Sequence, residues 1–203
     1  MKRLAIAALA LVAVAAPAVT VTAWGNTGHR LIGVAAMRAL PDELPAFLRT
    51  PAAIADVGEL AREPDRWKGA GQPHDRERDT AHFVDLDDQG RVYDQRGMSL
   101  NDLPRLKSEY DAALTKAGLD VNDAGYLPYA MMDAWQQLGR DFAYWRVLNA
   151  AEKRETNMER QAWYRADRLR REALILRDIG VMGHYVGDGS QPHHTSIHYN
   201  GWG

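Results

Sequence analysis

The chain has 203 residues and a formal net charge of −2 at pH 7, with 25 basic and 27 acidic residues. A net charge this close to zero gives no overall electrostatic case for binding nucleic acid or a membrane surface. The chain has no cysteine, so disulfides are excluded, and packing, a metal, or both must hold the folded chain together.

The first 23 residues have the features of an export signal. A short basic start is followed by an apolar run over residues 4–19, and residues 21–23 form a small-residue cleavage site of the A-x-A kind. The apolar run is too short and wrongly flanked for a membrane anchor. We therefore expect a secreted or periplasmic protein without a membrane anchor after processing, whose mature chain begins at Trp24 and forms one domain over residues 24–203.

The mature chain shows helical patterns and no convincing strand, repeat or linker. Pro41 stops the first pattern, and Thr156-Asn157-Met158-Glu159 has the form of a capping box that begins the last. The expected helices cover residues 27–40, 42–49, 51–61, 102–117, 126–151 and 156–189. The predicted fold class is therefore all-α, a single-domain multi-helix bundle.

The last predicted helix is the longest, and one stripe along it is rich in apolar and small residues. His184 continues this stripe, so its side chain is expected to point inward. The preceding members of the stripe are Trp163, Ala166, Leu169, Ala173, Leu176 and Gly180.

Residues 62–100 break the helical pattern. They are rich in Gly, Pro, Asp and Arg, which predicts a long loop with little regular structure. A loop of this length inside a compact domain is usually functional or disordered.

His184 and Asp188 stand four residues apart, so on a helix their side chains leave the same face one turn apart. Pro192 cannot continue the helix, and the resulting turn can bring His194 back to a neighbouring position. Histidine with carboxylate, and no cysteine, suits zinc in a hydrolytic site that keeps water as a ligand. The alternative is a histidine pair that serves packing or lies on the surface.

Two further segments contain possible metal ligands. The α-amine and carbonyl oxygen of Trp24 can chelate a metal in a five-membered ring, with His29 as a third ligand; otherwise Trp24 is simply the first residue after cleavage. Asp65 and His82 lie in the predicted loop, where such residues are ordinary surface residues by default. Together with His184 and Asp188 of the last helix they complete a ligand set for one metal.

These segments together resemble the S1/P1 nuclease family, part of the superfamily that includes zinc-dependent phospholipase C. Order and rough spacing agree over essentially the whole mature chain, and the motifs co-occur behind a signal peptide. The resemblance implies an α-helical fold with three clustered zinc ions. It rests on Trp24-Gly-Asn-x-Gly-His29, Asp65, His82-Phe-x-Asp85, His184-x-x-x-Asp188 and Gln191-Pro192-x-His194.

The resemblance also implies a role for each matching residue. The first zinc is assigned to Asp65, His82, His184 and Asp188. Its close partner is assigned to the Trp24 amine and carbonyl, His29 and a bridging Asp188, and His194 helps to bind the third. Phe83 and Asp85 occupy the positions that recognise a nucleobase, by stacking and by hydrogen bonding. Lys68 matches a position that contacts phosphate. Asp56 is an alternative to Asp65 in the alignment with the family, but the position of Lys68, three residues after Asp65, supports Asp65.

The chain departs from the family pattern at one point. The third zinc of the family also takes a histidine and an acidic residue from a later His-x-x-x-Asp/Glu motif, which does not occur before Gly203. His193 and His198 are nearby, but neither is followed four residues later by a carboxylate. We expect the sequence to be a C-terminally truncated fragment; the alternative is an incomplete third site.

Three functions agree with these observations. The first is a zinc-dependent endonuclease that hydrolyses the phosphodiester bonds of single-stranded DNA and RNA with a metal-activated water, using Asp65 and Lys68, without a stable protein partner. The second is a zinc-dependent phospholipase C, in which the first histidine lies farther from the N-terminus than His29 does here. The third is an inactive zinc-binding fragment.

The N-terminus provides a direct test. If the Trp24 α-amine binds zinc, a variant that keeps one residue before Trp24, or is acetylated there, should lose most activity and the zinc held by His29, because a peptide nitrogen has no free lone pair. It should keep the zinc held by His82 and His184. Mass spectrometry of the termini, elemental analysis and nuclease rates check this. Equal zinc and equal rate in the extended form would remove Trp24 from the site.

Overall fold

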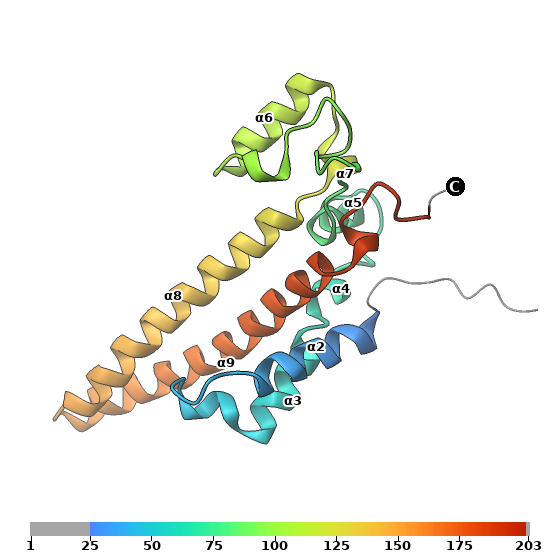
Figure 1. Cartoon of the computed structure of the whole chain (residues 1–203). Coiled ribbons are helices and arrows are strands. Elements are labelled where there is room, and N and C mark those ends of the chain that lie inside the picture. The colour runs from blue at the N-terminus through green and yellow to red at the C-terminus, as the bar shows by residue number, and fades with distance from the viewer. Residues whose placement is uncertain (1–24, 202–203) are drawn as a thin grey trace, which may run out of the picture.

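The computed structural model describes residues 25–201, so the predicted signal peptide and Trp24 lie outside the described residues (Figure 1). Within that range two isolated antiparallel bridges occur, and no strand. The all-α prediction is confirmed, and no helix of this range is long and apolar enough to cross a membrane. The helices are α2 (Asn26–Arg38), η1 (Ala46–Arg49), α3 (Pro51–Leu60), α4 (Glu63–Arg66), α5 (His74–Asp79), η2 (Thr80–His82), η3 (Leu100–Asp102), α6 (Lys107–Ala117), α7 (Val121–Ala124), α8 (Leu127–Arg154), α9 (Met158–Gly189) and η4 (Pro192–His194), where η marks a 3-10 helix.

Helices α8 and α9 form a long antiparallel hairpin that is the largest feature of the fold (Figure 1). Asn157 caps α9, because its side chain accepts a hydrogen bond from the backbone N–H of Arg160 at 3.0 Å. Polar contacts join the two helices, among them Arg171 Nη1 to Asp141 Oδ1 at 2.9 Å. The end of the hairpin near the C-terminus of α9 is where α2, α4, α5 and η2 gather, and this end contains the candidate site (Figure 1).

The prediction that one stripe of α9 points inward is wrong for the first half of the helix. Trp163 is 58% exposed and Leu169 is 50% exposed, and Ala166 and Ala173 are also exposed. In this half, polar pairs such as Arg168 Nε to Glu152 Oε2 at 2.6 Å join α9 to α8 on another face. The stripe becomes buried only farther along, where α2 and α3 also pack on α9.

A cluster of apolar side chains joins α2, η1 and α3 to α9. Met37, Leu48, Val57 and Ile175 are its most deeply buried members, and each aliphatic side chain buried in this way contributes about 1.5–3 kcal/mol. At the end of α3 the backbone touches α9: a Cβ at Gly180 would lie 2.8 Å from the Leu60 carbonyl carbon and 2.9 Å from the Ala61 nitrogen. This approach places the Ala61 carbonyl beside His184.

The prediction of a loop over residues 62–100 is partly wrong, because the segment contains α4, α5 and η2. Helix α4 has Pro64 in its first turn together with Glu63 and Asp65, which favour a helix start. Helices of four to six residues are too short to show an apolar period, so the sequence pattern did not indicate them. Two predicted helices also begin later than expected, at Ala46 and Lys107.

The chain enters α8 through a turn that is fixed to η2 and Phe83. The Tyr126 N–H donates to the Thr80 carbonyl at 2.6 Å, and the Leu127 N–H donates to the Phe83 carbonyl at 3.0 Å. Gly125 precedes them with φ 85°, and a Cβ there would lie 2.1 Å from the Phe83 carbonyl oxygen. Only glycine therefore fits at this position, and its place fixes Phe83.

Replacing Gly125 with alanine should destabilise the protein by at least about 2 kcal/mol, because the methyl group clashes with Phe83 and the left-handed backbone is strained. Gly139→Ala is the matched control. Gly139 lies in the interior of α8 with no atom within 4 Å of an added Cβ, so this change should stabilise by about 0.5–1 kcal/mol. Urea denaturation of both variants checks the prediction, and equal midpoints would contradict it.

Candidate metal centre

Helix α9 positions the two ligands of the predicted His-x-x-x-Asp motif. His184 and Asp188 are both fully buried, and His184 Nε2 lies 3.2 Å from Asp188 Oδ2. The two side chains therefore leave the same face of the helix, as their spacing predicts.

Three other histidines approach the same carboxylate from separate segments. His29 of α2 places Nε2 at 3.3 Å from Asp188 Oδ1. His82 of η2 places Nδ1 at 3.1 Å from Oδ2, and His194 of η4 places Nε2 at 3.5 Å from Oδ1. The Asp188 carboxylate thus lies among four imidazoles from four segments of the chain.

Asp65 of α4 adds a second carboxylate at the edge of this cluster. Its Oδ2 lies 3.9 Å from His29 Nε2, and its Oδ1 lies 4.0 Å from His82 Nδ1. Lys68 Nζ lies 3.1 Å from Asp65 Oδ1, so the predicted phosphate-binding residue borders the cluster. Asp56, the alternative to Asp65 in the sequence, is on an exposed position of α3.

Two sets of three residues have ligand atoms within 4.8 Å of one another and can hold a metal ion. One is His82, His184 and Asp188, which are three of the four residues predicted for the first zinc. The other is His29, Asp65 and His184, so here Asp65 accompanies His29. His194 contacts Asp188 but belongs to neither set.

The arrangement of the ligand atoms favours a bound cation over hydrogen bonds among these side chains. The Ala61 carbonyl accepts a hydrogen bond from His184 Nδ1 at 2.8 Å, so a neutral His184 ring keeps its proton on Nδ1 and has a lone pair on Nε2. That lone pair lies 3.0 Å from His82 Nδ1 and 3.2 Å from Asp188 Oδ2. Asp188 Oδ1 is buried without a hydrogen-bond partner among the described residues. A proton satisfies one such pair, whereas a divalent cation takes all these lone pairs.

The ionisation states agree with metal binding. Burial alone would raise the pKa of Asp188, but the surrounding imidazoles of His184, His29 and His82 hold that pKa well below its usual range. Burial lowers the pKa of His82, and it also lowers the pKa of His194. An ionised carboxylate among neutral imidazoles is the form that binds metal.

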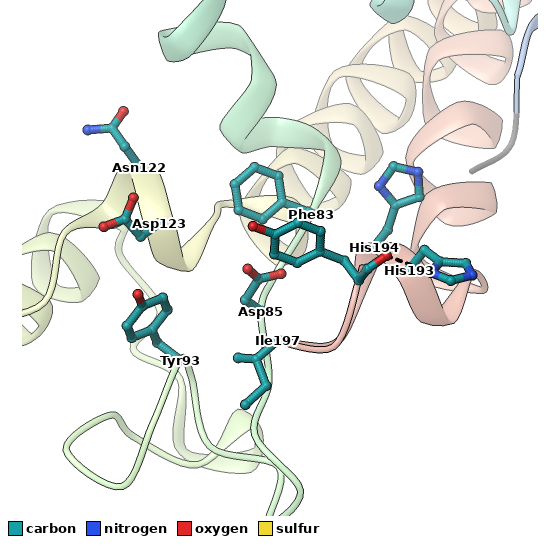
Figure 2. A pocket seen from close by; sticks show the side chains of 9 residues that line it. Phe83, Asp85, Tyr93, Asn122, Asp123, His193, His194 and Ile197 are labelled. Carbon is teal, nitrogen blue, oxygen red and sulfur yellow. Dashed lines mark hydrogen bonds between the residues drawn. The ribbon is translucent and has the colours of Figure 1, made fainter. Parts of the chain in front are cut away.

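A cavity of about 700 Å³ adjoins the metal centre (Figure 2). His194 contacts Asp188 and also lines the cavity, so the two sites share a wall. The two residues predicted to recognise a base, Phe83 and Asp85, both line it. The other lining residues are Tyr93, Asn122, Asp123, His193, Ile197 and Tyr199.

The sequence did not indicate three of the residues that line this cavity. Tyr93, Asn122 and Asp123 belong to a bridged loop and to the short helix α7, and neither segment has a motif that marks a site. Tyr93 has φ 67°, a conformation that is uncommon outside glycine, asparagine and aspartate. No sequence signal predicts such an angle at a tyrosine.

The metal centre predicts that purified mature protein binds at least two divalent ions, and that EDTA lowers its melting temperature, because the ligands come from four separate segments. Asp188→Asn should lose most of the metal and most of the response to EDTA. Asp167→Asn, on the same helix but outside the centre, is the matched control. Elemental analysis and thermal unfolding check this; wild-type protein without stoichiometric metal, and with melting unchanged by EDTA, would contradict it.

Comparisons with known proteins return no match: no family model, no curated protein and no solved structure matches this chain. The candidate site therefore stands on the geometry described above, and membership of the S1/P1 nuclease family stays a prediction from the motifs.

Proposed function

We propose that this protein is a zinc-dependent phosphodiesterase of the S1/P1 nuclease type that hydrolyses single-stranded DNA and RNA. The observation that carries the proposal is the shared wall between the two sites. A cluster of buried histidines and aspartates that can hold metal adjoins a large cavity lined by aromatic and acidic side chains, and His194 belongs to both.

Zinc is the metal that the donor set favours, because imidazole and carboxylate ligands without cysteine suit a hydrolytic zinc site. His82, His184 and Asp188 would hold one ion, and His29 with Asp65 would contribute to a second. The resemblance adds the Trp24 amine and carbonyl, and it implies a third ion near His194. Bound zinc supplies Lewis-acid chemistry, which makes water a nucleophile near neutral pH.

The residues around the centre have distinct tasks in this reaction. Asp188 and Asp65 provide negative charge that holds cations. Lys68 is one-third exposed beside Asp65, where its ammonium can contact a phosphate oxygen. Water gives up a proton as its oxygen bonds to phosphorus, the bond from phosphorus to the leaving oxygen breaks, and that oxygen takes up a proton from solvent. No serine or cysteine nucleophile is needed.

The adjoining cavity supports the proposed preference for single strands. A base that is not paired can leave the stack and lie on an aromatic ring, and Phe83 provides such a ring at the cavity wall (Figure 2). Asp85 lies beside it and can accept hydrogen bonds from a base edge. Bases of a duplex stay stacked and paired, so they do not reach the cavity without an added energetic cost.

The test compares turnover on single-stranded DNA, duplex DNA and phosphatidylcholine, with zinc and with EDTA. We expect zinc-dependent cleavage of the single strand above all. Phe83→Ala should weaken nucleotide binding by about 1–3 kcal/mol, as for other aromatic platforms, while the zinc content is unchanged.

The outcomes separate the competing functions. Turnover of phosphatidylcholine alone would identify a phospholipase C, and bound zinc without turnover of any substrate would identify an inactive metal-binding protein. A Phe83→Ala protein that unfolds or loses zinc would show that Phe83 is a core residue, and the base-binding role would be wrong.

A further inference from the structure

The cavity beside the candidate metal centre contains a carboxylate that accepts no hydrogen bond from the described residues. Asp85 is 6% exposed and lines the cavity. Within the described part of the chain, only its backbone groups form hydrogen bonds: the N–H donates to the Ala124 carbonyl, and the carbonyl accepts from the Tyr93 N–H. A carboxylate with so little exposure is poorly solvated, and this costs free energy. A ligand that brings donors to Asp85 removes that cost.

The opposite side of the cavity adds a second carboxylate. In Figure 2, Phe83 and Asp85 lie across the open space from Asp123, Asn122 and Tyr93. Burial raises the pKa of Asp85 to about 7, and the charge of Asp123 contributes to this shift. The Tyr93 N–H donates to the Asp85 carbonyl at 2.6 Å, which ties this wall to the backbone of Asp85.

An ionised carboxylate can only accept hydrogen bonds, so two of them select a ligand edge that is rich in donors. Among the four DNA bases only guanine has two adjacent donor groups, N1–H and N2–H₂, on its pairing edge. Adenine and cytosine have one amino group beside a ring nitrogen that accepts, and thymine has one N–H between two carbonyl groups. A carboxylate that faces an acceptor is repelled, and the buried mismatch is costly.

We propose that this cavity selects guanine among the bases, with Asp85 accepting from N1–H and N2–H and Asp123 accepting from the remaining N2–H. The proposal rests on the proposed function, since it names the base preference of the same substrate site. Phe83 and Tyr93 provide the aromatic surfaces, which tolerate any base. The selectivity among bases therefore depends on the two aspartates, and not on ring stacking or on the metal centre.

The experiment measures binding of the four 5′-deoxynucleoside monophosphates to zinc-loaded protein by calorimetry. The pH is kept well above 7, where Asp85, with a pKa of about 7, is ionised. We expect the guanine nucleotide to bind at least about tenfold tighter than the other three, as for a well-matched pair of hydrogen bonds to a base. Four equal affinities would overturn the inference.

Two substitutions locate the selection. Asp85→Asn replaces two acceptors with one donor and one acceptor, so the guanine preference should disappear and adenine should bind at least as well. Asp123→Asn should reduce the preference without reversing it. Asp133→Asn is the control, because this exposed carboxylate of α8 lies outside the cavity. Retention of full guanine preference by Asp85→Asn would exclude Asp85 as the selecting residue.

Folding is checked separately. The raised pKa of Asp85 means that the folded protein holds its proton more tightly than the unfolded chain does, so wild-type stability is lost as pH rises from about 4 through about 7. Asp85→Asn lacks this loss and should be at least as stable as wild type above pH 7. If that variant unfolds, Asp123→Asn decides the question by the same binding measurement.

The same preparations are assayed on single-stranded oligomers of one base each. Cleavage of these oligomers with four equal nucleotide affinities would overturn the guanine inference and leave the proposed function intact. Absence of cleavage and of nucleotide binding in zinc-loaded protein would overturn both.

Discussion

Four segments of the fold meet at one buried carboxylate. Asp188 lies among imidazoles from α2, η2, α9 and η4, at distances of 3.1–3.5 Å between carboxylate oxygens and ring nitrogens. These segments are far apart in the sequence and join at one end of the α8–α9 hairpin (Figure 1). In water each of these groups is solvated, so burying them together is favourable only when a proton or a metal compensates the lone pairs. A metal ion bound here would therefore link metal binding to the folding of this end.

Backbone contacts bring the ligands to their places. The chain after α3 lies so close to α9 that Gly180 has no room for a Cβ, and this approach lets the Ala61 carbonyl hold His184 Nδ1 at 2.8 Å. At Gly187 a Cβ would lie 2.9 Å from Ile32 Cδ1 and 3.5 Å from His29 Nδ1. Small residues on α9 thus set the distance between helices, and that distance sets the geometry of the donor atoms.

The metal centre and the cavity have opposite electrostatics although they share His194. In the candidate metal centre, contact with the imidazoles of three histidines holds the pKa of Asp188 well below its usual range, despite the burial of this carboxylate. In the cavity, burial and the nearby charge of Asp123 raise the pKa of Asp85 to about 7. The first arrangement suits a cation, and the second suits a neutral group that has hydrogen-bond donors. This division agrees with a site that combines metal-dependent chemistry with recognition of a base.

The sequence by itself determined the all-α class, the long helices, and the ligand candidates, because periodicity and an i, i+4 spacing are local properties. The tertiary structure decided which faces of the helices are covered by other segments. Trp163 and Leu169 follow the predicted stripe yet are exposed, since α2 and α3 pack only on the later part of α9. It also decided that Asp65 and not Asp56 joins the cluster, that Ala61 fixes the His184 proton, and that Tyr93 and Asp123 complete the cavity. These features depend on backbone positions set by packing between distant segments, such as Ala61 and His184, which are 123 residues apart. No local pattern encodes such positions.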